Sequence, residues 1–224
     1  HSFPTRRSSD LRLGLCLGVG MGGAKWSPLS IVGLSFLYDW TSPRFTTIAG
    51  GAASADGGFV GRAHGLVASR NLVAQADTAV RPQWRPSGGP SAGKGAIEWD
   101  GSTDTLLFNT DGASILSGSS ALLACVVYLS PTGARNAVCG RGGYNDTGMT
   151  LEVTSDNEIV LFLKVATTGY VTVRSHVLPA TVTAGWYVLV ASVLAGTAYL
   201  ARYGATTQTA TATGNIAFLA GAFY

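Results

Sequence analysis

Residues 97–106 read IEWDGSTDTL, and this run, together with the segment 71–96 before it, decides the fold. Apolar Ile97 and Trp99 alternate with polar neighbours, which is the two-residue period of a β-strand. The pair Asp100-Gly101 is a turn signal, because glycine adopts positive φ freely and aspartate can bond its own backbone. An apolar run then resumes at 106–108. The sequence here predicts a strand, a turn and a second strand.

Short apolar runs separated by turn residues continue to the end of the chain. Ala121–Leu129 is apolar at almost every position, which predicts a strand buried between two layers. Many short strands with Gly, Pro, Asn and Asp between them predict an all-β, antiparallel two-sheet sandwich. The other strands expected in this half are Ala137–Cys139, Met149–Val153, Glu158–Val165, Tyr170–Ser175, Trp186–Leu194, Ala198–Tyr203 and Ile216–Ala220.

The N-terminal half is less regular. Pro28–Trp40 is the first strand-like run, and Phe59–Ala63 predicts a short strand. Leu66–Ala76 fits either a helical turn or a strand, because its apolar residues satisfy both periods. The glycine-rich segment Gly50–Gly58 predicts a loop, and the proline- and glycine-rich segment Pro82–Gly95 predicts irregular structure.

The order of these pieces resembles a known family. Asn71-Leu72, Gln75, Arg81-Pro82, a Gly-rich gap and the strand and turn at 97–101 resemble the opening of a concanavalin A-like (laminin G-like, LamG) jelly-roll domain. Residues 183–186, TAGW, resemble the turn before a central strand of that family. Residues 198–204 resemble its next strand, with Tyr203 in place of the usual Asn. The resemblance covers about residues 29–220, and it implies a jelly roll that binds glycans or hydrolyses glucans.

The two ends of the sequence are interpreted separately from the sandwich. Residues 1–11, HSFPTRRSSDL, read as the translation of a common sequencing adapter, so we expect this segment to be artefactual and the sequence to be metagenomic. A segment of this origin carries no information about the fold. For the Gly/Leu-rich lead-in 12–27, an extended segment is favoured over a secretion signal. The remainder, 28–224, is expected to be one incomplete β-sandwich, a fragment truncated at its C-terminus.

The composition bounds the possible partners. The chain has 224 residues, of which 46% are hydrophobic and only 12% are charged, against roughly 25% charged in typical globular domains. The formal net charge is +3, and setting 1–11 aside lowers it to +2. Such near neutrality predicts neither a nucleic-acid partner nor an anionic membrane surface. No apolar run reaches the roughly 18 residues that cross a bilayer.

The three cysteines, Cys16, Cys125 and Cys139, lack the spacing of a metal site. Cys125 and Cys139 lie in apolar strand-like runs, which favours two buried thiols that act as small hydrophobic groups. A bridge between these two residues, on neighbouring strands, is the alternative. It would require an oxidising compartment.

The hydrolases of the resembled family use two catalytic carboxylates spaced as Glu-x-Asp-x-Glu on one strand. Alternation along a strand places such residues on one face, where one attacks and the other protonates. Glu152, Asp156 and Glu158 are four and two residues apart, and Asp156-Asn157 is expected in a hairpin turn. We therefore interpret all three as solvated turn acids. No other catalytic motif is recognised, so no enzymatic activity, catalytic residue or cofactor is predicted.

Two places carry residues of the kind that sugar sites use. Trp84 lies in the proline-rich segment and could stack on a sugar, although burial at one end of the sandwich is the favoured alternative. Tyr144, Asn145 and Asp146 share one loop and offer a ring and two oxygen ligands. Calcium is a weaker expectation there, because several members of the resembled family bind it through such oxygens.

The resemblance and the low charge together lead to a functional expectation. The chain is expected to be a non-catalytic carbohydrate-binding, lectin-like or purely structural module of a phage tail or other virion protein. Its location would be the virion or the extracellular space, and its partners would be glycans, the host cell surface or other virion proteins. The alternatives are the binding module of a secreted bacterial glycoside hydrolase or adhesin, and a degenerate hydrolase whose acids lie outside the sequence.

Overall fold

The computed structural model describes residues 37–39, 41–67, 71–74, 81–99, 106–108, 118–130, 133, 136–140, 148–174 and 182–216. All of these residues belong to one compact unit, Ser35–Tyr224. The described residues form strands and turns and no helix, which confirms the all-β class. Among them, accordingly, there is no helix of the length and apolarity that crossing a membrane takes.

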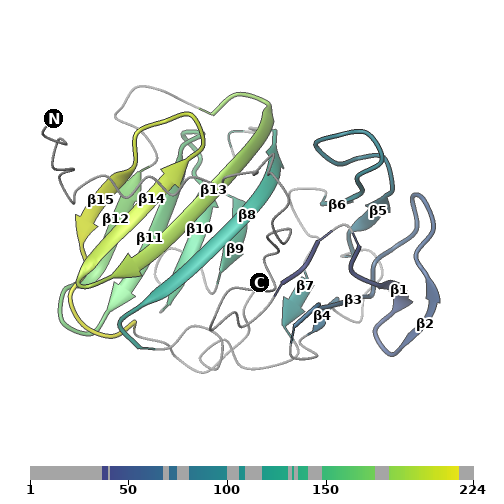
Figure 1. Cartoon of the computed structure of the whole chain (residues 1–224), viewed down its shortest axis with the longest axis horizontal. Coiled ribbons are helices and arrows are strands. Elements are labelled where there is room, and N and C mark those ends of the chain that lie inside the picture. Colours follow the sequence, from purple (N-terminus) through teal and green to yellow (C-terminus); the bar gives the residue numbers. More distant parts are fainter. Residues whose placement is uncertain are drawn as a thin grey trace, which may run out of the picture. The chain divides into compact units, whose positions relative to one another are not determined.

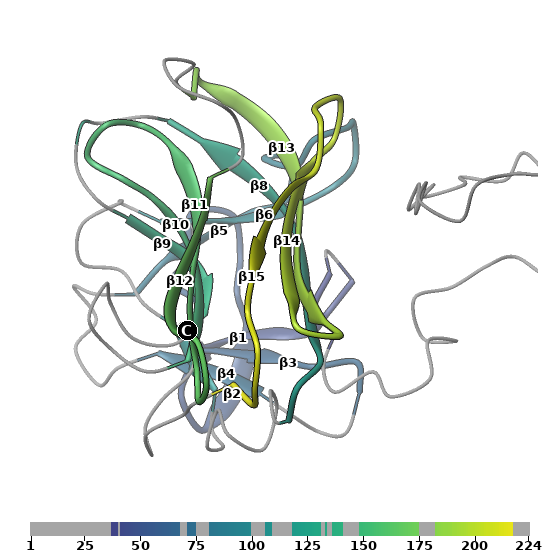
Figure 2. The same ribbon diagram turned by 90° about the vertical axis from the view of Figure 1, so that its left-hand side faces the viewer.

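The second half of the chain forms a sandwich of two four-stranded antiparallel sheets, as the sequence predicted (Figures 1 and 2). The back sheet has the order β12-β11-β10-β9, so strands consecutive in sequence are neighbours. The front sheet has the order β15-β14-β13-β8, and the whole back sheet lies between β8 and β13 in sequence. The strands are β8 (Ala121–Leu129), β9 (Asn136–Gly140), β10 (Met149–Val153), β11 (Ile159–Val165), β12 (Gly169–Arg174), β13 (Gly185–Leu194), β14 (Thr197–Arg202) and β15 (Gln208–Thr211).

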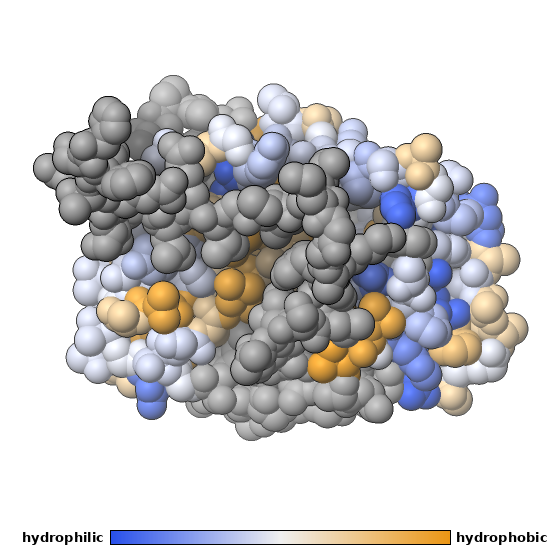
Figure 3. Space-filling view, viewed as in Figure 1, coloured by the Kyte–Doolittle hydropathy of each residue, from blue (hydrophilic) through white to orange (hydrophobic). Residues whose placement is uncertain are grey.

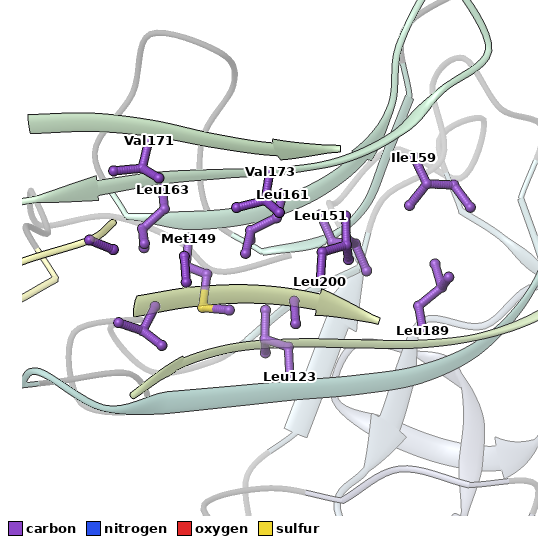
Figure 4. Close-up of a cluster of buried hydrophobic side chains, with 14 of the residues drawn as sticks. Leu123, Met149, Leu151, Ile159, Leu161, Leu163, Val171, Val173, Leu189 and Leu200 are labelled. Atoms are coloured by element: carbon purple, nitrogen blue, oxygen red, sulfur yellow. The ribbon is translucent and has the colours of Figure 1, made fainter. Parts of the chain in front are cut away.

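A hydrophobic core fills the space between the two sheets. Alternate residues of each strand enter it, because successive side chains of a strand point to opposite faces. Leu123, Leu189 and Leu200 come from the front sheet, and Met149 and Leu161 come from the back sheet, all of them buried (Figure 4). Burying a side chain of this size is worth about 1.5–3 kcal/mol, so this core is the main stabilising contact between the sheets.

Strand β8 differs from its prediction. The sequence predicted a strand covered on both faces, but β8 is the last described strand of the front sheet, and only its inner face is covered. Leu123 and Leu129 are buried, whereas Leu122, Val126 and Tyr128 are exposed. Apolar residues at exposed positions look like buried residues in a sequence, which explains the error.

The turns of the sandwich follow the chemistry that the sequence predicted. The β10–β11 turn closes where Asn157 donates its backbone N–H to the carbonyl of Thr154 at 2.9 Å, and Asn157 has a φ of 58°. Asparagine tolerates this left-handed conformation better than most residues. Gly169 and Gly204, with φ of 81° each, lie at the β11–β12 and β14–β15 turns. Both glycines lie between strands that the sequence predicted, where glycine adopts positive φ freely.

The first half of the chain forms a five-stranded antiparallel sheet and a two-stranded ribbon. The sheet has the order β2-β1-β3-β4-β7, and the ribbon pairs β5 with β6. The predicted strands at 97–99 and 106–108 correspond to β6 and β7. The bounds are β1 (Arg44–Thr47), β2 (Gly50–Ala53), β3 (Arg62–His64), β4 (Asn71–Ala74), β5 (Gln83–Arg85), β6 (Ala96–Glu98) and β7 (Leu106–Phe108).

Two predictions for this half were wrong in part. The expected loop Gly50–Gly58 begins with β2, which pairs with β1 in a hairpin. The expected irregular segment Pro82–Gly95 contains β5, because the backbone of Trp84 is paired on both sides. Trp84 donates its N–H to the carbonyl of Gly58 at 3.0 Å, and it pairs with Ile97 across the ribbon. Partners distant in sequence override the local signal of proline and glycine. Most of the strand-like run Pro28–Trp40 and the turn at Asp100-Gly101 lie outside the described residues.

Candidate binding surface

The outer face of the front sheet carries no charged residue on its four strands. Its members are identified by register, because they alternate with the buried core residues Leu123, Leu189 and Leu200. They are Leu122, Ala124, Val126 and Tyr128 on β8, Trp186, Val188, Val190, Ser192 and Leu194 on β13, Thr197, Tyr199 and Ala201 on β14, and Thr209 and Thr211 on β15. The face is thus made of apolar, aromatic and hydroxyl side chains.

Three aromatic residues gather at one end of this face. Tyr128 lies opposite Trp186 in the β8–β13 pairing, and their ring centroids are 5.5 Å apart in an edge-to-face arrangement. Tyr203 follows the last residue of β14 and donates its backbone N–H to the carbonyl of Val188 at 3.0 Å. Their exposed fractions are 52% for Tyr128, 37% for Trp186 and 86% for Tyr203. We call these three residues the aromatic row.

The row follows from the register of three adjacent strands. Trp186 is two residues before Val188 on β13, and Val188 is opposite Tyr203, so Trp186 and Tyr203 are diagonal neighbours. Diagonal neighbours across antiparallel strands lie about 7–8 Å apart. Exposed rings at such spacing offer apolar surface to a ligand that is long enough to contact more than one of them.

The figures place this surface in the molecule. The front sheet faces the viewer in Figure 1, and over its strands Figure 3 shows apolar residues in orange beside pale residues of intermediate hydropathy. The strongly hydrophilic residues, in blue, are concentrated over β1 to β6. Exposed apolar area of this kind commonly marks a binding surface. The absence of charged residues at the outer positions of β8, β13, β14 and β15 favours a neutral ligand or an apolar protein partner over an anion.

Trp84 does not form part of an exposed site. Only 8% of it is exposed, and it belongs to a small buried cluster with Val60 and Ala63. The guanidinium of Arg44 lies 3.5 Å from the centroid of its ring, and Gly95 lies close against the ring edge. Stacking of Trp84 on a sugar is therefore a wrong prediction. The ring is instead buried, which is the alternative that the sequence favoured, because residues distant in sequence cover it.

The other residues of the predicted ligand site, Tyr144, Asn145 and Asp146, lie outside the described residues. The calcium site expected in their loop therefore remains a prediction. Within the described part of the chain, no group of three or more His, Cys, Asp or Glu side chains is placed to hold a metal ion.

The three acids of the β10–β11 hairpin behave differently from one another. Asp156 is exposed in the turn, as predicted. Glu152 and Glu158 are almost completely buried, so the interpretation of these two as solvated turn acids was wrong. Glu158 forms an ion pair with Arg174 of β12, whose side chain is about half exposed. A buried carboxylate needs such a partner, because removing an unpaired charge from water is costly.

Cys125 and Cys139 face each other across the core. Cys125 pairs with Leu189 in the front sheet and Cys139 pairs with Leu151 in the back sheet, and both of these leucines point into the core. The thiols are free, half-buried and hydrogen-bonded to each other. This bond lowers the pKa of Cys125, since the thiol of Cys139 donates to its sulfur, and it raises the pKa of Cys139, as does burial. They thus lie on facing sheets and not on neighbouring strands of one sheet.

Comparison with known proteins gives no family assignment. No protein-family model, no curated protein and no solved structure matches this chain. The class of molecule that its own residues define is an antiparallel all-β sandwich with an uncharged, partly aromatic outer face.

The sequence alone did not lead to the aromatic row. A usable signal was present, because Tyr128 and Trp186 occupy alternate positions with buried residues in two long strands that carry no charge. Recognising it requires knowing that β8 and β13 are neighbours. Their partnership spans more than fifty residues, and no local pattern encodes it.

Proposed function

We propose that this chain is a non-catalytic binding module that holds a neutral glycan on the outer face of its front sheet. The aromatic row supports this proposal most directly. Tyr128, Trp186 and Tyr203 are exposed, and sugar rings present C–H groups that pack on electron-rich aromatic faces. The phenol hydroxyls of Tyr128 and Tyr203 in the row, and the hydroxyls of Ser192 and Thr197 toward the other end of the face, can exchange hydrogen bonds with sugar hydroxyls.

The uncharged character of this face decides the class of glycan. A sialylated or sulfated chain would gain nothing from the outer positions of β8, β13, β14 and β15, because none of them holds a cation. We therefore propose a neutral oligosaccharide or polysaccharide. The module would belong to a virion protein, such as a phage tail protein that meets host-surface glycan, or to a secreted hydrolase or adhesin.

A glycan array on the full chain tests this function. We expect binding to neutral glycans, and we expect Trp186→Ala and Tyr203→Ala each to weaken it about tenfold or more, which is typical of losing one stacked ring. Tyr170→Ala is the matched control, because Tyr170 is an exposed aromatic residue on the back sheet. Equal losses in the control and the test variants, or no binding by the wild type, would contradict the proposal.

A second function is supported by the aliphatic part of the same face. Leu122, Val126 and Leu194 are each about half exposed, and exposed aliphatic side chains favour contact with another protein over contact with a sugar. In this alternative the face is an assembly surface of a virion. Sedimentation of the wild type and of Leu122→Lys separates the two: concentration-dependent association that the lysine abolishes supports assembly, and a monomer at all concentrations supports the glycan module.

A further inference from the structure

We infer that Cys125 and Cys139 form a disulfide that joins the two sheets when the chain is oxidised. The inference does not depend on the proposed ligand. It rests on where the two strands lie. Among the described strands, β8 is the end strand of the front sheet and β9 is the end strand of the back sheet. The two thiols come from these two end strands.

The packing holds the thiols together. Both cysteines are packed against the same core cluster, and their thiols are in hydrogen-bonding contact. Their core-facing neighbours Leu189 and Leu151 are fully buried, which fixes the two strands. The two side chains enter the same core from the end strands of facing sheets, so rotation of the side chains is the adjustment that brings the sulfur atoms to the roughly 2.05 Å of a disulfide bond.

The chemistry balances with a low-molecular-weight disulfide such as glutathione disulfide as the oxidant. The Cys125 thiolate attacks one sulfur of that disulfide, forming a mixed disulfide and releasing one glutathione thiolate. Cys139 then loses its proton and attacks the Cys125 sulfur, which releases the second glutathione. The protein loses two hydrogens and two electrons, and the oxidant becomes two thiols. Cys125 attacks first because its pKa is the lower of the two.

The bond would matter for the fold because it closes a loop of the unfolded chain. Thirteen residues, 126–138, separate the two cysteines. Closing a loop of this size restricts the denatured state, and the predicted rise in Tm for a domain of this length is roughly 5–10 °C. Such a fastening suits a virion or secreted location, where disulfides persist.

The experiment uses the full chain carrying Cys16→Ser, so that only two thiols remain, and compares it with Cys125→Ser/Cys139→Ser in the same background. After glutathione disulfide treatment, the native protein should lose about 2 Da, resist alkylation in denaturant and yield a linked Cys125–Cys139 peptide. Its Tm should rise by about the amount above and fall again with reductant, and the double variant should show neither change.

Three results would overturn the inference. The first is two freely alkylated thiols after oxidation of the folded protein. The second is a bond that forms only in denaturant, and the third is a Tm that falls when the bond forms. Because the wild-type pair is itself oxidised and reduced, the experiment remains decisive even if a serine variant folds poorly.

Discussion

At the scale of single residues, Gly95 shows how a buried aromatic ring restricts its neighbour. A Cβ atom at Gly95 would lie 1.9 Å from an edge carbon of the Trp84 ring, and no real contact is so short. Trp84 cannot move away easily, because Arg44 covers its ring and Val60 and Ala63 pack in the same cluster. The glycine is needed here for space and not for a turn.

We therefore predict that Gly95→Ala destabilises the protein by about 2–3 kcal/mol, the upper range for overpacking a well-filled site. The measurement is urea unfolding followed by tryptophan fluorescence. Gly185→Ala is the control, because a Cβ atom there meets nothing within 4 Å and Gly185 has no left-handed φ. An unchanged unfolding midpoint for Gly95→Ala would show that the Trp84 ring is not held as described.

The two facing thiols give a prediction about pH. The pKa of Cys125 is lowered because Cys139 donates a hydrogen bond to it, while burial acts in the opposite direction. Replacing the donor by Cys139→Ala leaves burial unopposed, so the pKa of Cys125 should rise. Cys139→Ser keeps a hydroxyl donor and should preserve most of the lowering.

Alkylation of Cys125 by iodoacetamide, measured against pH in a Cys16→Ser background, checks this prediction. The thiolate is the reactive form, so the midpoint of the rate profile follows the pKa. We expect the midpoint to move to higher pH in Cys139→Ala and to stay close to the parent in Cys139→Ser. Identical profiles in all three proteins would refute the hydrogen bond between the thiols.

At the scale of elements, the β13–β14 hairpin contains an unusual turn residue. Leu194 pairs with Thr197, so the loop is the two residues Ala195 and Gly196, which have φ of 48° and 79°. Positive φ at both positions is the pattern of a type I′ turn, in which Asn-Gly is preferred. Alanine is strained there because its Cβ atom approaches the backbone.

Replacing Ala195 by Asn should therefore stabilise the hairpin, by about 0.5–1 kcal/mol. Thermal unfolding of Ala195→Asn and of wild type checks the sign, and Ala195→Val is the matched opposite change, which should destabilise because a β-branched residue resists left-handed φ. A destabilised Ala195→Asn would mean that this loop has a different conformation.

Strand β8 provides a second prediction at this scale, because its two faces differ so clearly. Leu123 is buried in the core, while Val126 is 56% exposed on the outer face. Leu123→Ala should cost about 2–4 kcal/mol, and Val126→Lys should change stability by no more than about 0.5 kcal/mol. Chemical denaturation of both variants gives the answer. Equal costs would mean that β8 is covered on both faces, as its sequence had suggested.

At the scale of the whole molecule, the sequence predicted the layers better than the surface. Alternation and turn residues were enough for strands such as β11 and β14, because both signals are local. Trp84 could not be placed in the same way, since its burial depends on Arg44 of β1 and on Gly95, which directly precedes β6. Glu158 was misjudged for a similar reason, because its partner Arg174 is one strand away.

The exposed face of the front sheet could not be predicted from the sequence either, because it too depends on which strands are neighbours. An apolar residue such as Val126 predicts burial when only the sequence is considered. The position of β8 beside β13 at the end of the front sheet shows that Val126 lies on the outer face, where no described strand covers it. The aromatic row exists because residues from three strands meet in register. The proposed binding function therefore depends on a surface that three assembled strands form together, and not on a sequence motif.

The most direct test is to locate the ligand by nuclear magnetic resonance. A ¹⁵N-labelled full chain is titrated with the neutral oligosaccharide that binds best on the array, and the backbone and indole signals are followed. We predict that shifts concentrate at Tyr128, Trp186 and Tyr203 and their outer-face neighbours, with the back sheet unaffected. Shifts centred on Tyr170 or on Tyr144, Asn145 and Asp146, or no shift at saturating sugar, would contradict the account.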